Sequence, residues 1–289
     1  MTKIIEANIG NWYVQCIPED GGRISVLSYE GQDLLTSNPP SFRPPEKFYG
    51  AYETRPVFGY DDCFPTVDEC TYPADQSECS DHGELCWMEW QVLRECNSLV
   101  CIANCPNPKV TFKRILEFAG NKLIWRFEVI NLSAIKLPFL HVMHPLLPLG
   151  KIQSIKLPEF GNIVEEINAA TLGFKTADQV ANHLMSIPFG AYEMLLLKEI
   201  RKGSVKLAFK KGMILNISFD VKLFPTLGIW WNKTGYPDED GLRRTECAFE
   251  PIPGSCSNLE KSFRKGSFME IEPGKSLSWE IIWEIENNS

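Results

Sequence analysis

The chain has 289 residues, a net charge of −8 and ten cysteines. This charge, with no run of Lys or Arg, argues against binding to nucleic acid, because affinity for a phosphate backbone depends on clustered cations. No export signal stands at the N-terminus and no apolar stretch approaches the ~18 residues of a membrane span, so we expect a cytoplasmic protein with no membrane partner. The length permits a sizeable core, and we expect a single domain over residues 1–289.

Hydrophobic alternation with a period of two predicts β-strands along most of the chain. Residues 121–132 and 275–286 each send large apolar side chains to one face, among them Leu123, Trp125, Phe127, Val129, Trp279 and Trp283. Residues 204–209 and 213–220, joined by Lys-Lys-Gly, predict a hairpin. Only residues 176–187, with Thr176 as the N-cap, indicate a short helix. The predicted fold class is therefore all-β, a large antiparallel β-sandwich with few short helices.

Seven of the ten cysteines lie between Cys63 and Cys105. Structural zinc sites typically use two closely spaced C-x₂₋₄-C pairs, whereas the gaps here are mostly longer and irregular. We therefore expect reduced, buried thiols, no metal and no cofactor. A metal-binding or redox protein remains the alternative that this segment leaves open.

Polar side chains gather among aromatic ones in four stretches, at residues 59–70, 80–90, 137–150 and 249–255. They contain His82, His144 and Glu250. Histidine changes charge near neutral pH and a carboxylate is its natural complement as a base, so these three could supply an acid, a positioning donor and a base. The apolar neighbours of Glu250 could raise its pKa by desolvation.

The other two histidines are less promising. His141 lies three residues before His144, so on a strand the two side chains would point to opposite faces and at most one would line a cleft. His183 lies in the predicted helix, and we expect a structural role for it.

The order of several short motifs carries a family resemblance. They are "GGRISVLSYEGQDLL" (21–35), "DHGE" around His82, "HPLL" from His144, "LGIWWN" (227–232) and "FEP" with Glu250. In this order they resemble the aldose 1-epimerases, the galactose mutarotase-like family, and the chain looks like a divergent member over nearly its whole length. The resemblance implies a β-sandwich with a sugar cleft across one sheet, and an isomerase that interconverts the α and β anomers of a free aldose without a cofactor.

The resemblance also implies roles for individual residues. Glu250 matches the base that deprotonates the anomeric hydroxyl, His144 the acid at the ring oxygen, and His82 the residue that hydrogen-bonds near that oxygen. The roles of the two histidines could be exchanged.

Substrate-binding candidates come from the chemistry of sugar sites, which need aromatic faces and planar polar groups. The candidates are Asp62, Arg55, Trp231 and Asn232. The family resemblance also implies a substrate-binding aspartate, for which Asp220 is a candidate. Asp62 could equally make an Asx turn. Of the adjacent Trp230 and Trp231, one is expected to belong to the core.

The chain departs from the family pattern in two places, and these leave the sugar open. Gly83-Glu84 replaces a doubled glycine, and Leu146 replaces an aromatic residue. A phosphorylated sugar would call for converging cations, for which Arg55, Arg243 and Arg244 are available. The alternatives are a hexose-6-phosphate mutarotase and a non-catalytic carbohydrate-binding protein, in either case a monomer or homodimer whose partner is a small sugar.

Overall fold

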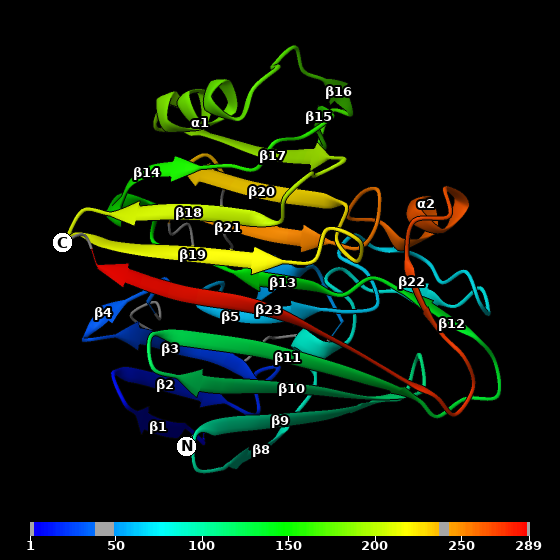
Figure 1. Cartoon of the computed structure of the whole chain (residues 1–289). Helices are drawn as coiled ribbons and strands as arrows, with labels where there is room; N and C mark the ends of the chain where they lie inside the picture. Colours follow the sequence, from blue (N-terminus) through cyan, green and yellow to red (C-terminus); the bar gives the residue numbers. More distant parts are fainter. Residues whose placement is uncertain (1–2, 38–48, 237–242, 288–289) are drawn as a thin grey trace.

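The structure is a computed structural model that describes residues 3–37, 49–236 and 243–287, and its strands form large antiparallel sheets (Figure 1). The largest sheet has eight strands in the order β14-β18-β19-β23-β11-β10-β9-β8. Their bounds are Ile152–Lys156 (β14), Ser204–Phe209 (β18), Met213–Phe219 (β19), Ser276–Asn287 (β23), Lys122–Asn131 (β11), Val110–Ala119 (β10), Ser98–Cys105 (β9) and Gln91–Arg94 (β8).

Two further sheets meet edge to edge. The six-stranded sheet holds Ile5–Ile9 (β1), Trp12–Ile17 (β2), Arg23–Tyr29 (β3), Gln32–Asp33 (β4), Tyr60–Cys63 (β5) and Val142–Pro145 (β13). The five-stranded sheet holds Ala170–Thr171 (β16), Asn162–Glu165 (β15), Ala191–Lys198 (β17), Thr226–Lys233 (β20) and Thr245–Ile252 (β21). Leu147, just after β13, exchanges two backbone hydrogen bonds with Cys247 of β21, which joins the sheets. Two short pairs complete the strands: Leu137–Phe139 (β12) with Met269–Ile271 (β22), and Cys70–Thr71 (β6) with Glu78–Cys79 (β7).

The apolar faces of the sheets pack together into one large core. The alternation predicted for residues 121–132 is confirmed, because Leu123, Trp125, Phe127 and Val129 are all buried in β11. Across the layers, the Trp125 ring lies 4.5 Å from that of Tyr60 on β5. Fully burying a large apolar side chain contributes about 1.5–3 kcal/mol, so alternation of this kind fixes which face of each strand turns inward.

The predicted hairpin is confirmed as β18–β19, in which Leu207 lies opposite Leu215. The predicted helix is confirmed as α1 (Ala177–Ser186), where Thr176 and Gln179 form a capping box. The sequence analysis missed α2 (Leu259–Arg264), which Asn258 caps. Among the described residues, no helix is long and apolar enough to cross a membrane.

All ten cysteines have free thiols, and seven of the ten are buried: Cys16, Cys63, Cys79, Cys86, Cys101, Cys105 and Cys247. The expectation of reduced thiols that pack as small apolar groups agrees with this arrangement.

Candidate active site

A cleft of about 640 Å³ opens where the six-stranded and five-stranded sheets meet. Its wall includes His82, His144 and Glu250, the three residues that the sequence pointed to for acid–base chemistry. They come from three separate parts of the chain: the turn after β7, strand β13 and strand β21. The fold thus brings His82 and Glu250 together in one cleft, although they lie more than 160 residues apart in the sequence.

Glu250 owes its position to a glycine on the neighbouring strand. It pairs in register with Gly228 of β20, and a Cβ on that glycine would lie 3.2 Å from Glu250 Oε2. The glycine of "LGIWWN" therefore leaves room for the carboxylate. Burial raises the pKa of Glu250 to about 8, with repulsion from Glu166 and Asp61 adding to this and the positive charge of His82 opposing it. With this pKa the protonated form of the Glu250 carboxyl group is favoured at neutral pH.

His144 is oriented by Asp61, its partner in register on β5. Its Nδ1 lies 3.0 Å from Asp61 Oδ1, and the Tyr52 hydroxyl donates a 2.7 Å hydrogen bond to Asp61 Oδ2. The ring nitrogen Nδ1 therefore points at a carboxylate, and the other nitrogen, Nε2, lies 3.9 Å from Glu250 Oε1. This arrangement places an imidazole nitrogen and a carboxylate side by side in the cleft.

The charges around His144 set its protonation. Burial lowers the pKa of His144, and Asp61 partly offsets this by stabilising the imidazolium. Burial alone would raise the pKa of Asp61, but Arg23, His144 and Arg55 together hold that pKa well below its ordinary value. Asp61 is therefore a permanent anion beside His144. The imidazole and Glu250 can share a single proton between them over the neutral range.

His82 stands on a tight turn of left-handed backbone, with φ of 61° at His82 and 71° at Gly83. A Cβ at Gly83 would lie 2.0 Å from the carbonyl oxygen of Phe64, so only glycine fits there. Glu84 follows with an ordinary φ of −93° and donates its backbone N–H to that same oxygen. The family's second glycine is therefore not required by this backbone, which explains one of the two departures.

Two contacts fix the orientation of the His82 ring. It stacks on Tyr52, with ring centroids 3.8 Å apart and an interplanar angle of 11°. Its Nδ1 lies 2.8 Å from Asp81 Oδ1, and Asp81 also accepts the backbone N–H of Tyr52 at 2.9 Å. The centroids of the His82 and His144 rings are 5.1 Å apart. The Tyr52 hydroxyl lies 3.3 Å from His144 Nδ1, so Tyr52 contacts both histidines.

Aromatic and cationic side chains form part of the remaining cleft wall. The Trp230 and Tyr236 rings line it and meet edge to face, 5.2 Å apart. Four cationic side chains also line the cleft: Lys198, Arg244, Lys261 and Lys265. Lys261 lies on the unpredicted helix α2, and Lys265 directly follows that helix.

Five sequence candidates for substrate binding do not line the cleft. Asp62 and Arg55 are buried in polar clusters, Asp62 against Arg114 and His141, and Arg55 against Asp20. On β5 successive side chains alternate in direction, and it is Asp61 rather than Asp62 that turns toward His144. Asp62 makes no Asx turn either, since it lies within a strand.

The other three candidates lie elsewhere. Trp231 is fully buried in the core, and its neighbour Trp230 lines the cleft instead. Asn232 is buried and accepts hydrogen bonds from the backbone N–H groups of Gly235 and Tyr236, so it shapes the loop rather than the cleft. Asp220 is exposed in the turn after β19.

The remaining histidines are separated from the cleft as expected. His141 is fully buried and bonded at both ring nitrogens, to Asp62 and to the indole N–H of Trp279. His183 pairs with Glu193 at 2.8 Å. Sequence reasoning missed Tyr52, which carries no local motif, and Asp81, although a carboxylate directly before His82 was a visible signal.

Comparison with known proteins was made by sequence and by structure. No protein-family model and no curated protein matches the sequence. Solved structures match over nearly the whole chain. A protein from Synechocystis sp. PCC 6803 has a TM-score of 0.76 at 15% identity, covering 100% of this chain and 97% of its own. A galactose mutarotase-like protein from Clostridium acetobutylicum has a TM-score of 0.72 at 16% identity, with coverage of 99% and 96%.

An aldose epimerase homologue from C. elegans also matches, with a TM-score of 0.65 at 13% identity over 100% of both chains. Identities this low establish a shared fold and leave the activity and the substrate to be argued from the site. The chain has the galactose mutarotase-like β-sandwich fold, as the order of its sequence motifs implied.

Proposed function

We propose that the protein is an aldose 1-epimerase-like mutarotase that interconverts the α and β anomers of an aldose in this cleft. The observation that carries the proposal is the 3.9 Å approach of His144 Nε2 to Glu250 Oε1. The anomeric hydroxyl and the ring oxygen of a sugar are attached to the same carbon. A base and an acid this close together can therefore serve both oxygens at once.

The chemistry follows from the proton that the two residues share. Ionised Glu250 removes the proton of the anomeric hydroxyl while protonated His144 donates a proton to the ring oxygen. The bond between that oxygen and the anomeric carbon breaks, and the open chain is an aldehyde. Rotation about the adjacent carbon–carbon bond and reversal of both proton transfers close the ring as the other anomer. Asp61 stabilises the imidazolium, and His82 positions the ring oxygen and its neighbouring hydroxyl.

The cations of the cleft favour a second candidate substrate, a sugar that carries an anionic group. Lys198, Lys261 and Lys265 line the cleft together with Arg244. A phosphate or carboxylate would be bound by several of them, because charge-assisted hydrogen bonds are about twice as strong as neutral ones. The candidates are then a neutral aldose and a hexose 6-phosphate, handled by the same acid–base pair.

Exchange NMR between α and β anomers tests the proposal across a panel of aldoses, hexose 6-phosphates and sugar acids. We expect acceleration of at least one sugar, which Glu250→Gln reduces by about 10²-fold or more, since general acid–base catalysis contributes about 10²–10⁴. Glu193→Gln is the matched control, because Glu193 pairs with His183 and does not line the cleft.

A sugar-binding protein without catalysis would give a different result. The resonances of a sugar would shift when it binds, but exchange between its anomers would not be accelerated. Glu250→Gln would then leave the exchange rate unchanged. That outcome would contradict the proposed mutarotase.

A further inference from the structure

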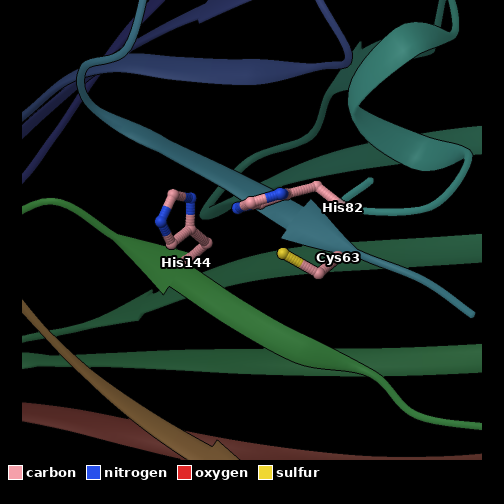
Figure 2. Close-up of side chains that lie close together, drawn as sticks. All are labelled: Cys63, His82 and His144. Carbon is pink, nitrogen blue, oxygen red and sulfur yellow. The ribbon is translucent and has the colours of Figure 1, made fainter. Parts of the chain in front are cut away.

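A cysteine that the acid–base mechanism does not use lies beside both histidines of the cleft. Cys63 is buried on β5, two residues after Asp61 and on the same face of the strand. One potential ligand atom from each of Cys63, His82 and His144 lies within 4.8 Å of the other two. Figure 2 shows the Cys63 sulfur and the two rings close together, with His144 Nδ1 on the side of the ring that faces His82.

We propose that Cys63, His82 and His144 form a binding site for a thiophilic divalent cation of the Zn²⁺ type. Thiolate and imidazole are the ligands that Zn²⁺ prefers, with bonds of about 2.3 Å to sulfur and about 2.0–2.1 Å to nitrogen. Tetrahedral bonds of these lengths place neighbouring ligand atoms about 3.5 Å apart. The ligand atoms would therefore move closer together by about 1 Å on binding.

The surroundings of both histidines match those of metal ligands. A histidine that binds a metal usually directs its other ring nitrogen at a carboxylate, which fixes the orientation of the ring. His144 Nδ1 lies 3.0 Å from Asp61 and His82 Nδ1 lies 2.8 Å from Asp81, so a carboxylate fixes the orientation of each ring. His141 provides the contrast, because Trp279 and Asp62 occupy both of its nitrogens.

Three protein ligands would leave a fourth tetrahedral position, which a water molecule can fill. Since the thiol must lose its proton to bind, metal binding would release protons and strengthen as the pH rises. The site draws one cysteine and two histidines together through the fold, which is why the spacing of the cysteines in the sequence did not indicate it.

Metal binding would also act on catalysis. A cation bound to His144 would oppose protonation of the imidazole, which the mechanism uses as acid, so the loaded protein would exchange anomers more slowly. This consequence rests on the proposed function, whereas the metal site itself does not. Cys63 would then be the residue that makes the cleft sensitive to thiophilic metals.

The experiment uses the full chain, reduced and freed of metal with a chelator. Zn²⁺ binding is measured by calorimetry, and Co²⁺ is added separately to detect the thiolate-to-cobalt charge-transfer band. We expect one equivalent of Zn²⁺, a cobalt–thiolate band, and at least a tenfold loss of affinity in both Cys63→Ser and His82→Gln. Cys70→Ser is the matched control, because Cys70 lies opposite Cys79 in another close pair of thiols.

The outcomes separate the metal site from the mutarotase. Absence of the cobalt–thiolate band in the wild type, or equal Zn²⁺ affinity in Cys63→Ser and the wild type, would overturn the site. Zn²⁺ binding through Cys63 in a protein that exchanges no anomers would uphold the site and contradict the proposed function. Because the band is read on the wild type, the test does not depend on how well a variant folds.

Discussion

Two aspartate–histidine pairs lie side by side, with both aspartates on strand β5, His144 on strand β13 and His141 directly before β13, and only the Asp61–His144 pair faces the cleft. Asp61 pairs with His144 and Asp62 pairs with His141, each at 3.0 Å, and each aspartate is also bound by a buried arginine. In the core pair both nitrogens of His141 are bonded. In the cleft pair, His144 Nε2 looks toward Glu250. The two pairs are built from the same groups and differ in whether one ring nitrogen of the histidine faces the cleft.

The largest effect on stability should come from breaking the core pair. Asp62→Asn leaves Arg114 buried without its carboxylate partner, so we expect the free energy of unfolding to fall by roughly 3–5 kcal/mol. Chemical denaturation followed by circular dichroism measures this. Asp220→Asn, at an exposed position, is the control and should stay within about 0.5 kcal/mol. A stable Asp62→Asn protein that had lost anomer exchange would contradict the division between the pairs.

Glu250→Gln should stabilise the protein while it abolishes exchange. The folded-state pKa of Glu250 is raised from 4.5 to about 8, so ionisation opposes folding at every pH above 4.5. At pH 7 this costs about 3 kcal/mol, which the neutral amide avoids. We expect the gain in thermal stability to grow as the pH rises from 4.5 to 8 and to vanish at lower pH. A gain in stability that did not vary with pH would show that the pKa of Glu250 is not raised in the folded state.

Asp61→Asn should reduce anomer exchange at the cleft without abolishing it. Without the neighbouring anion the pKa of His144 falls further, so the protonated form that donates to the ring oxygen becomes rarer. We expect kcat/KM per folded molecule to fall by about tenfold, equivalent to roughly 1.4 kcal/mol. The acid limb of the pH profile should move to lower pH. Wild-type activity in Asp61→Asn would show that His144 does not work as a cation.

The pH profile of the wild type should be bell-shaped, because the mechanism needs one proton on the Glu250–His144 pair. Above about pH 8 that proton is lost and the acid is missing. Below the lowered pKa of His144 both groups are protonated and the base is missing. The measurement is exchange NMR with the uncatalysed rate subtracted at each pH. Activity that kept rising above pH 9 would contradict a shared proton.

The sequence predicted the sheets, and it pointed to three residues that the fold brings together in one cleft, whose acid–base roles remain a proposal; it predicted the surrounding wall less well. Alternation identified β11 and the β18–β19 hairpin because one face of each is packed in the core. Motif order identified His82, His144 and Glu250. Alternation shows that adjacent side chains point apart, but it does not show which one faces a cleft. Trp231 was therefore chosen where Trp230 lines the wall, and Asp62 where Asp61 meets His144.

Other contacts lie beyond local patterns altogether. Tyr52 braces both histidines from a one-turn 3₁₀-helix (Tyr52–Thr54) that no periodicity marks. Cys63 lies near His144 because β5 and β13 are neighbours, and near His82 because Phe64 forms a bridge with Gly83. Single-domain organisation, oligomeric state and location remain predictions.

The most direct test of the account compares anomer exchange in His144→Gln and His141→Gln, normalised to the folded fraction of each. The two histidines are three residues apart, and each is paired with an aspartate. We predict that His144→Gln loses about 10²-fold or more in exchange rate. His141→Gln should be less stable yet exchange anomers at nearly the wild-type rate per folded molecule. Equal losses in both variants, or a normal rate in His144→Gln, would contradict the assignment of catalysis to the cleft pair.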